Sequence, residues 1–149
     1  MVRRIDRSIA YHGGDREQAL EELEGLVVRL SEAGYLDDVR YARARAEDLH
    51  RRGTSMRAIR AKLRQKGLSS EEIEGALGHL SAESEDPDLV AAVAYARRRR
   101  LGPFRLEEDP DSARRRREFG ALARAGFPAG LARRIIDAKS IDELESDHF

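Results

Sequence analysis

Glycines that follow short runs of helix-spaced apolar residues are the feature that most constrains what this chain can fold into. Apolar residues recur three or four positions apart along almost the whole sequence, as in Met56, Ile59 and Leu63. A glycine such as Gly67 follows several of these runs, and glycine is favoured just beyond the end of a helix. Strand-like alternation and clusters of Val, Ile and Thr are absent. The sequence therefore predicts an all-α protein of short helices.

Polar residues at the expected helix starts support this interpretation. Ser69, with Glu72 three residues later, forms a capping box, and Asp86-Pro87 places a capping residue before a proline at the first helical position. A short helix is expected before Gly13, and the next one is expected to start at Asp15. The buried stripe predicted for that second helix consists of Leu20, Leu23, Val27 and Leu30.

An internal repeat emerges when the glycines are aligned. The segment from Leu63 to Ser69 parallels the segment from Leu122 to Pro128, and another helix ending in glycine precedes each. The unit is three helices of about 40–50 residues, which needs a neighbour stacked against it to be stable. We therefore predict tandem three-helix repeats stacked into an elongated, curved array with an incomplete first repeat. The predicted divisions are a partial first repeat at 1–36, a second repeat at 37–81, a linker at 82–85, a third repeat at 86–138 and an acidic, frayed tail at 139–149.

The composition excludes several classes of protein. The chain has no Cys, which excludes a disulfide scaffold, a Cys-ligated zinc site, an iron–sulfur cluster and a thiol nucleophile. Its four histidines have no metal-binding spacing, and neither a nucleophile elbow nor a phosphate-binding loop is present. No apolar run approaches the roughly 18 residues of a membrane span. The sequence thus predicts a cytoplasmic protein that is not an enzyme and takes no cofactor or metal.

Charge is balanced overall but segregated along the chain. Lys and Arg total 28, as do Asp and Glu. Residues 39–68 include ten basic and two acidic residues, and residues 97–117 include nine and four, whereas residues 69–88 include seven acidic residues and no basic one. Most of the basic residues are arginines, whose planar fork suits phosphate or carboxylate. The arginine codons of a GC-rich genome would produce the same bias.

The basic helices are therefore the candidate interaction surfaces. Arg57, Arg60 and Arg64 line one face of the helix expected after Ser55. One interpretation is a solvated face balanced by acidic neighbours, and the other is a surface for phosphates or for an acidic protein. Isolated aromatic residues disfavour base stacking, and the acidic start of the following helix disfavours helix-turn-helix readout.

Three stretches of the sequence resemble the RecX family of RecA regulators. They run from Gly34 to Ala42, from Arg51 to Ile59 and from Leu63 to Leu68, and they keep the order and spacing of the family's motifs. Residues 97–104, together with residues 124–127, resemble the last repeat of alphaproteobacterial members. The motif residues mainly end, cap or pack helices, so they identify the fold more than they locate an interface.

The resemblance implies a non-enzymatic protein that binds in the groove of the RecA–single-stranded-DNA filament. Such a protein restrains filament extension, the RecA ATPase and strand exchange, and so regulates homologous recombination, DNA repair and the SOS response. We expect it to be a monomer that reaches DNA phosphates through the filament. The first repeat is expected to be shorter than is usual in the family. The residues predicted to bind RecA or DNA phosphate are the cations of the basic helices, Arg57, Arg60, Lys62, Arg64, Arg98, Arg99, Arg115 and Arg116.

Two other interpretations stay open at this point. One is an autonomous helical DNA-binding protein that contacts phosphates through its Arg-rich helices, which would bind bare DNA with a steep salt dependence. The other is an interaction module for a different partner, in which case the resemblance reflects the fold alone.

Overall fold

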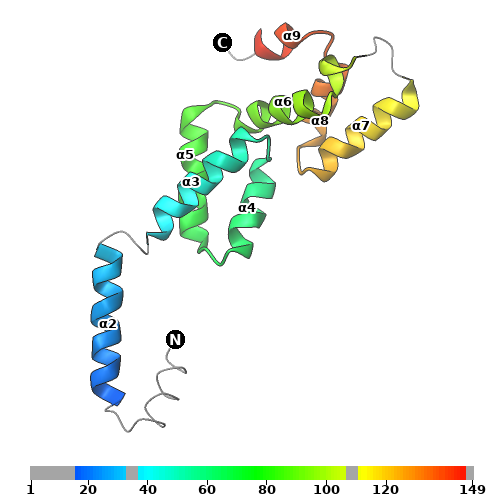
Figure 1. Ribbon diagram of the computed structural model, residues 1–149. Helices are drawn as coiled ribbons and strands as arrows, with labels where there is room; N and C mark the ends of the chain where they lie inside the picture. Colours follow the sequence, from blue (N-terminus) through cyan, green and yellow to red (C-terminus); the bar gives the residue numbers. More distant parts are fainter. Residues whose placement is uncertain (1–15, 33–36, 107–110, 147–149) are drawn as a thin grey trace. The chain divides into compact units, whose positions relative to one another are not determined.

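The computed structural model describes residues 16–32, 37–106 and 111–146 of the 149-residue chain, and every element in these ranges is a helix (Figure 1). The chain divides into two compact units, Met1–Asp37 and Asp38–Phe149. The described helix of the first unit is α2 (Arg16–Glu32). The second unit contains α3 (Asp38–Arg51), α4 (Met56–Gln65), α5 (Ser70–Glu83), α6 (Pro87–Arg99), the short 3-10 helix η1 (Gly102–Phe104), α7 (Ser112–Arg124), α8 (Ala129–Asp137) and α9 (Ile141–Ser146).

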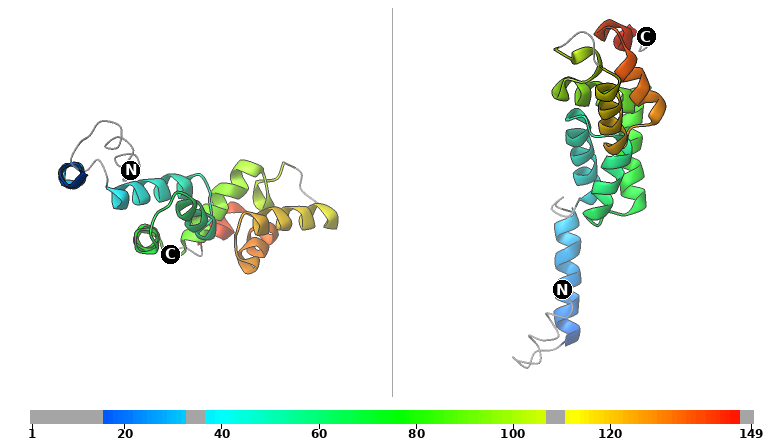
Figure 2. Two further views of the ribbon diagram at one scale, coloured as in Figure 1. Left: turned by 90° about the horizontal axis from the view of Figure 1, so that it is seen from below. Right: turned by 90° about the vertical axis from the view of Figure 1, so that its right-hand side faces the viewer.

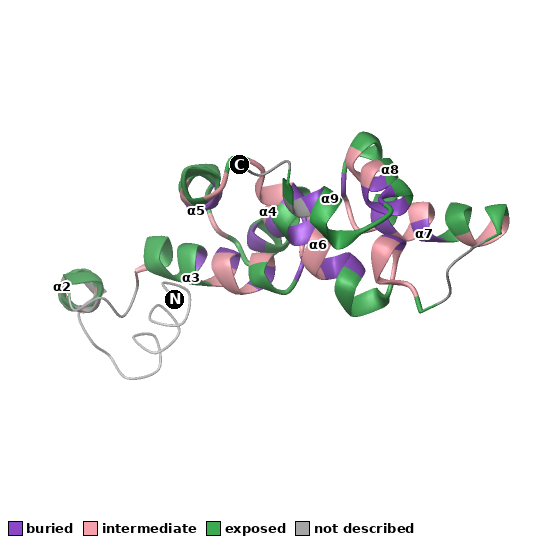
Figure 3. Cartoon of the chain, turned by 90° about the horizontal axis from the view of Figure 1, so that it is seen from above, coloured by how far each residue is buried: buried purple, intermediate pink, exposed green. Residues whose placement is uncertain are grey.

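The apolar side chains of α2 are largely exposed. Leu20 and Leu23 are half-buried, but Val27 is 42% exposed, so the prediction of a buried stripe is wrong for this helix. In Figure 3, where α2 is seen end-on, its visible ribbon is mostly in the colour of exposed residues. Helix α2 is the one described helix of its unit. The side chain of Leu30 and the helix expected before Gly13 lie outside the described residues.

Helices α3, α4 and α5 form the second repeat around an aliphatic interior. Ser55 caps α4, and Ser69 with Glu72 forms the predicted capping box at α5. Gly53 and Gly67 have φ angles of +82° and +84°, the left-handed backbone expected of a helix stop. Of the predicted apolar run, Ile59 and Leu63 are fully buried, and Met56 is partly buried against the same core. The other buried residues of this core are Ala42, Ala46, Leu49, Ile73, Ala76, Leu77 and Leu80.

Helices α6, α7 and α8 form the third repeat. Asp86 caps α6 as predicted, but the helix ends at Arg99 because Arg100 adopts a left-handed φ of 57°. Asp111 caps α7 through a hydrogen bond from the Arg114 N–H. Asp109-Pro110, a second pair of a capping residue and a proline in the sequence, predicts the start of this helix but lies outside the described residues. The interior of this repeat is centred on Leu89, Tyr95, Leu122, Phe127, Ile135 and Ile136.

Two features near the ends of the repeats differ from the predictions. Helix α5 continues to Glu83, so half of the residues expected as a linker at 82–85 are helical. The tail expected to be frayed contains α9, whose Leu144 is 2% exposed and belongs to the core of the third repeat. Hydrogen bonds from the Glu143 N–H to Ser140 and from the Lys139 N–H to Glu143 cap this helix. One buried leucine and a cap therefore order a segment whose acidic composition suggests fraying.

The second and third repeats are joined through the start of α4. The Ser55 hydroxyl, which is fully buried, accepts a hydrogen bond from the Ala58 N–H at 3.2 Å and donates to the Ala125 carbonyl at 2.7 Å. The Asp88 carboxylate of α6 accepts the Met56 N–H at 2.8 Å. Because these bonds use backbone groups at helix ends, they fix α4 relative to both α6 and α7.

Two glycines allow the backbones to approach closely at this joint. A Cβ atom on Gly53 would lie 2.6 Å from the Tyr95 nitrogen, and one on Gly126 would lie 2.7 Å from the Ser55 Oγ. Helix α6 lies between the second repeat and the α7–α8 pair (Figures 1 and 2). The positions of the cationic faces on α4 and α7 are thus set by direct contact between the repeats.

Candidate interaction surfaces

Helix α4 carries the cationic face predicted from the sequence. Ile59 and Leu63 are fully buried, so the opposite side of the helix, with Arg57 and Arg64, faces solvent. Neither arginine makes a hydrogen bond or ion pair with another residue of the described ranges. Two of the three arginines predicted for this face are therefore open to a partner.

Arg60, the third arginine of this group, is held inside the second repeat. Its Nε and Nη2 atoms donate to the two carboxylate oxygens of Glu74 on α5, at 2.9 and 3.2 Å. The hydrogen bonding lowers the pKa of Glu74 and raises the pKa of Arg60. Both side chains remain substantially exposed, so solvent screens their attraction. A partner would have to compete with Glu74 for this guanidinium.

Lys62 lies on the flank of α4 that faces α3. Together with Lys66 and Arg45 it lines a shallow hollow of about 330 Å³ that also includes Leu63. Arg45 pairs with Asp48 at 3.3 Å, whereas the side chains of the two lysines have no hydrogen-bond or ion-pair partner among the described residues. Cations therefore extend from the outer face of α4 to its junction with α3.

The arginines at the end of α6 are anchored to the protein. Arg98 donates to the Arg52 carbonyl oxygen at 2.8 Å and satisfies a backbone group at the end of α3. The guanidinium carbons of Arg98 and Arg99 lie 5.9 and 5.2 Å from the centroid of the Tyr95 ring. Tyr95, isolated from other aromatic residues in the sequence, is thus buried beneath arginines of its own helix. Arg98 stabilises the junction of the two repeats, and Arg99 packs on its own repeat.

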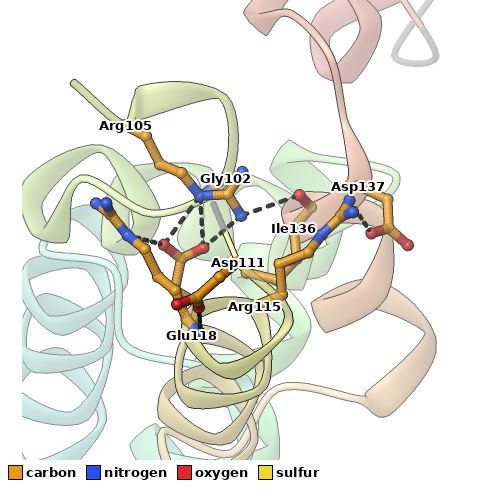
Figure 4. A network of polar contacts seen from close by, with 8 residues as sticks. Gly102, Arg105, Asp111, Arg115, Glu118, Ile136 and Asp137 are labelled. Atoms are coloured by element: carbon orange, nitrogen blue, oxygen red, sulfur yellow. Dashed lines mark hydrogen bonds and ion pairs between the residues drawn. The ribbon is translucent and has the colours of Figure 1, made fainter. Parts of the chain in front are cut away.

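On α7, Arg115 and Arg116 lie beside Phe119. Arg115 pairs with Asp137 of α8 at 2.9 Å (Figure 4), whereas Arg116 makes no hydrogen bond or ion pair with the rest of the described chain. Arg133 of α8 holds its guanidinium carbon 6.0 Å from the centroid of the Phe119 ring. Neither Phe119 nor Arg133 was a predicted surface residue, because their meeting depends on how α7 crosses α8.

A buried ion pair in the third repeat uses charges that the sequence counts as part of a basic block. Glu118 is 5% exposed and accepts hydrogen bonds from Arg105 Nε at 2.9 and 2.8 Å and from the Gly102 N–H at 3.3 Å (Figure 4). Arg114 also reaches it, at 3.3 Å. Burial raises the pKa of Glu118, but the hydrogen bonds from Arg105 and Gly102 outweigh it, so the pKa lies below its ordinary value.

This pair could be predicted only in part. The spacing of Arg114 and Glu118, four residues apart on one helix, predicts contact between them. Arg105, which supplies most of the hydrogen bonds, comes from the segment before α7, and no periodicity connects it to Glu118. Two of the arginines in the 97–117 block are thereby directed into the protein.

The eight predicted binding residues fall into two groups. The side chains of four are exposed and make no hydrogen bond or ion pair with any other described residue, namely Arg57, Lys62, Arg64 and Arg116. The side chains of the other four have partners within the protein, namely Arg60, Arg98, Arg99 and Arg115. Their binding to RecA or to DNA stays a prediction. In the described ranges no group of His, Asp and Glu is arranged to hold a metal ion. None of the helices described is long and apolar enough to cross a membrane.

The class of protein follows from these features: tandem three-helix units that present cationic helix faces, the most open of them on α4. Residues 37–77 match the domain described as RecX, second three-helix domain. The chain is 42% identical to the regulatory protein RecX of Myxococcus xanthus over 138 residues. This aligned region covers 93% of this chain and 73% of that protein. The chain belongs to the RecX family.

Two further relatives support this assignment. The regulatory protein RecX of Agrobacterium fabrum is 39% identical over 110 residues, which is 74% of this chain and 55% of that protein. That of Thermobifida fusca is 36% identical over 133 residues, or 89% of this chain and 66% of that protein. The chain thus spans about half to three quarters of the lengths of these curated relatives. No solved structure matches it.

Proposed function

We propose that this protein is a negative regulator of the RecA recombinase. The observation that carries the proposal is the 42% identity, over 93% of the chain, to a regulatory protein RecX. The motifs from Gly34 to Leu68 resemble those of a family whose members regulate RecA. The protein acts by binding in the groove of the RecA–single-stranded-DNA filament and restraining filament extension, the ATPase and strand exchange.

The exposed cations of α4 supply the contact surface. The guanidinium groups of Arg57 and Arg64 can each donate a pair of hydrogen bonds to a carboxylate of RecA or to a phosphate of the bound DNA. The hydrogen bonds of Ser55 and Asp88 hold the start of α4 against the third repeat. The face is therefore ordered before binding, which lowers the entropic cost of association.

Autonomous binding to bare DNA is the alternative, and the internal ion pairs argue against it. Arg60, Arg105 and Arg115 are each paired with a carboxylate of the protein, so they contribute little to neutralising phosphates. The balanced charge of the chain, 28 basic and 28 acidic residues, adds no long-range attraction to DNA. The open cations of α4, Arg57, Lys62 and Arg64, are few, which suits a partner that supplies contacts of its own.

The test is an assay of the RecA ATPase on single-stranded DNA as the concentration of this protein is raised, with bare-DNA binding measured at the same salt. We expect half-inhibition at a concentration at least about tenfold below that which coats bare DNA. Inhibition only at concentrations that coat the DNA would favour the autonomous DNA-binding protein. The absence of inhibition by the folded protein would contradict the proposal.

A further inference from the structure

We propose that the groove between α7 and α8 docks a protein segment in which an apolar side chain is flanked by carboxylates. This inference rests on the proposed function, because the segment would belong to the protein that this chain regulates. The groove has a volume of about 470 Å³ and is lined by Arg115, Arg116, Phe119, Arg133, Ile136 and Asp137.

Comparison of the two repeats shows what is unusual about this groove. Gly67 and Gly126 follow the middle helices of the second and third repeats and have the same left-handed backbone, with φ of +84° and +94°. Seven residues before each glycine stand Arg60 and Phe119, and seven residues after each stand Glu74 and Arg133. In the second repeat the residues at these positions form a bidentate ion pair that connects α4 to α5.

The third repeat replaces this closed ion pair with an aromatic ring and an unpaired cation. Phe119 is only half-buried, and Arg133 contacts its ring but has no carboxylate partner among the described residues. The corresponding positions therefore present an apolar surface and a charge that can be neutralised from outside. Packing of a three-helix repeat does not require a half-buried aromatic ring beside an arginine, since the second repeat packs without one.

The chemistry of the groove selects its occupant. Phe119 and Ile136 give it an apolar lining, which suits a leucine or similar side chain. Arg116 and Arg133 stand on the rim without a carboxylate from the described chain, so carboxylates on either side of the apolar residue complement them. Aromatic residues and arginines are also the residues that most often dominate protein interfaces.

A strand of nucleic acid fits the same groove less well. A base would have to stack on the Phe119 ring, but the guanidinium carbon of Arg133 lies 6.0 Å from the ring centroid and competes for that face. Asp137 stands on the rim and already neutralises Arg115. The cations left for a phosphate backbone are therefore Arg116 and Arg133 alone.

The chain itself suggests the variant that tests this site. Phe119→Arg combined with Arg133→Glu introduces into the third repeat the pair that Arg60 and Glu74 form in the second, so we expect it to fold. The matched control is Arg43→Ala with Glu47→Ala, which removes an exposed ion pair within α3 of the second repeat and leaves the groove unchanged. Circular dichroism and thermal unfolding establish that both variants are folded.

Binding is measured by fluorescence anisotropy with a labelled Glu-Glu-Leu-Glu-Glu peptide, a peptide with Ser in place of Leu, and an oligo(dT) strand. We expect the wild-type protein and the control to prefer the leucine peptide over the serine peptide by about tenfold, and the Phe119→Arg, Arg133→Glu variant to lose that preference. We also expect this variant to need about tenfold more protein for half-inhibition of the RecA ATPase.

The outcomes separate this inference from the proposed function. Unchanged peptide binding and unchanged inhibition by the folded groove variant would overturn the docking site while leaving RecA regulation intact. Loss of oligo(dT) binding without loss of peptide binding would also overturn it, in favour of a nucleic-acid site. If the wild-type protein fails to inhibit RecA, the proposed function fails. The preference for the leucine peptide then tests by itself whether the groove is a docking site.

Discussion

Eight residues before the glycine that follows the middle helix, the second repeat has Ile59 and the third has Glu118. Ile59 is fully buried among aliphatic side chains, and Glu118 is 5% exposed with Arg105 as its main partner. A carboxylate is tolerated there because the third repeat has a longer segment before its middle helix, which supplies the guanidinium. One helix position can thus hold either an aliphatic group or an ion pair, provided that the connecting segment delivers the partner.

The largest effect is expected from breaking the Arg105–Glu118 pair. Glu118→Gln keeps the size of the side chain but leaves the Arg105 guanidinium, whose side chain is 10% exposed, without its counter-charge. Breaking a buried pair in this way costs about 3–5 kcal/mol of unfolding free energy. Urea denaturation measures the loss. The double variant Glu118→Ile with Arg105→Met imitates the aliphatic interior around Ile59, so it should recover most of the lost unfolding free energy. If Glu118→Gln unfolds within about 1 kcal/mol of wild type, the ion pair does not stabilise this position as described.

The next largest effect tests the joint between the repeats. Gly53→Ala forces a left-handed backbone on a residue with a Cβ and drives that Cβ against the backbone of Tyr95, so a loss of about 2–4 kcal/mol is expected. Gly67→Ala is the matched control, because Gly67 has a similar φ but a Cβ atom added to it would meet nothing within 4 Å. It should lose only about 1 kcal/mol. Equal losses in thermal or urea unfolding would show that the joint adds nothing.

A smaller effect is expected from acidification. Because the pKa of Glu118 is lowered in the folded protein, its ion pair stabilises fully above the ordinary glutamate range, about pH 4. The contribution is lost as the pH falls through that range toward the lowered pKa. Unfolding free energy measured from about pH 7 to about pH 3 should therefore fall less steeply in the Glu118→Ile, Arg105→Met variant than in wild type. Parallel pH profiles would show that the pair does not titrate as described.

The smallest effect is expected at the exposed pair of the second repeat. Arg60→Ala with Glu74→Ala removes an ion pair whose side chains are 40% and 59% exposed, so solvent already screens most of the attraction. The melting temperature should stay close to that of wild type, and raising the salt concentration should narrow any difference further. A large drop in melting temperature would mean that this pair, and not the aliphatic interior, holds α4 against α5.

Local features of the fold were predictable from the sequence, and long-range ones were not. The Ser69 capping box and the stop at Gly67 depend on residues within one helical turn, so their chemistry is visible in the sequence. The exposure of Val27 was not predictable, since the apolar spacing of a helix indicates a stripe but not whether anything covers it. Leu144 shows the converse, because one apolar residue in an acidic tail gives no periodic signal.

The candidate surface was predictable to the same extent. Arg57 and Arg64 follow from helix periodicity with Ile59 and Leu63, and the structure places them on the open face of α4. The pairing of Arg60 with Glu74 and the meeting of Phe119 with Arg133 depend on how neighbouring helices cross, which spacing within one helix does not determine. Counting the charges in a block of sequence therefore overestimates the number of arginines available to a partner, because the fold pairs some of them within the protein.

The most direct test of RecA regulation through α4 compares wild type with the Arg57→Glu, Arg64→Glu variant in the RecA ATPase assay on single-stranded DNA. Both side chains are exposed and make no hydrogen bond or ion pair with a described residue, so the variant should unfold much like wild type. We expect its half-inhibitory concentration to rise by about tenfold or more, because charge reversal repels the surface that the arginines contact. Full inhibition by the folded variant at the wild-type concentration would contradict regulation through this face.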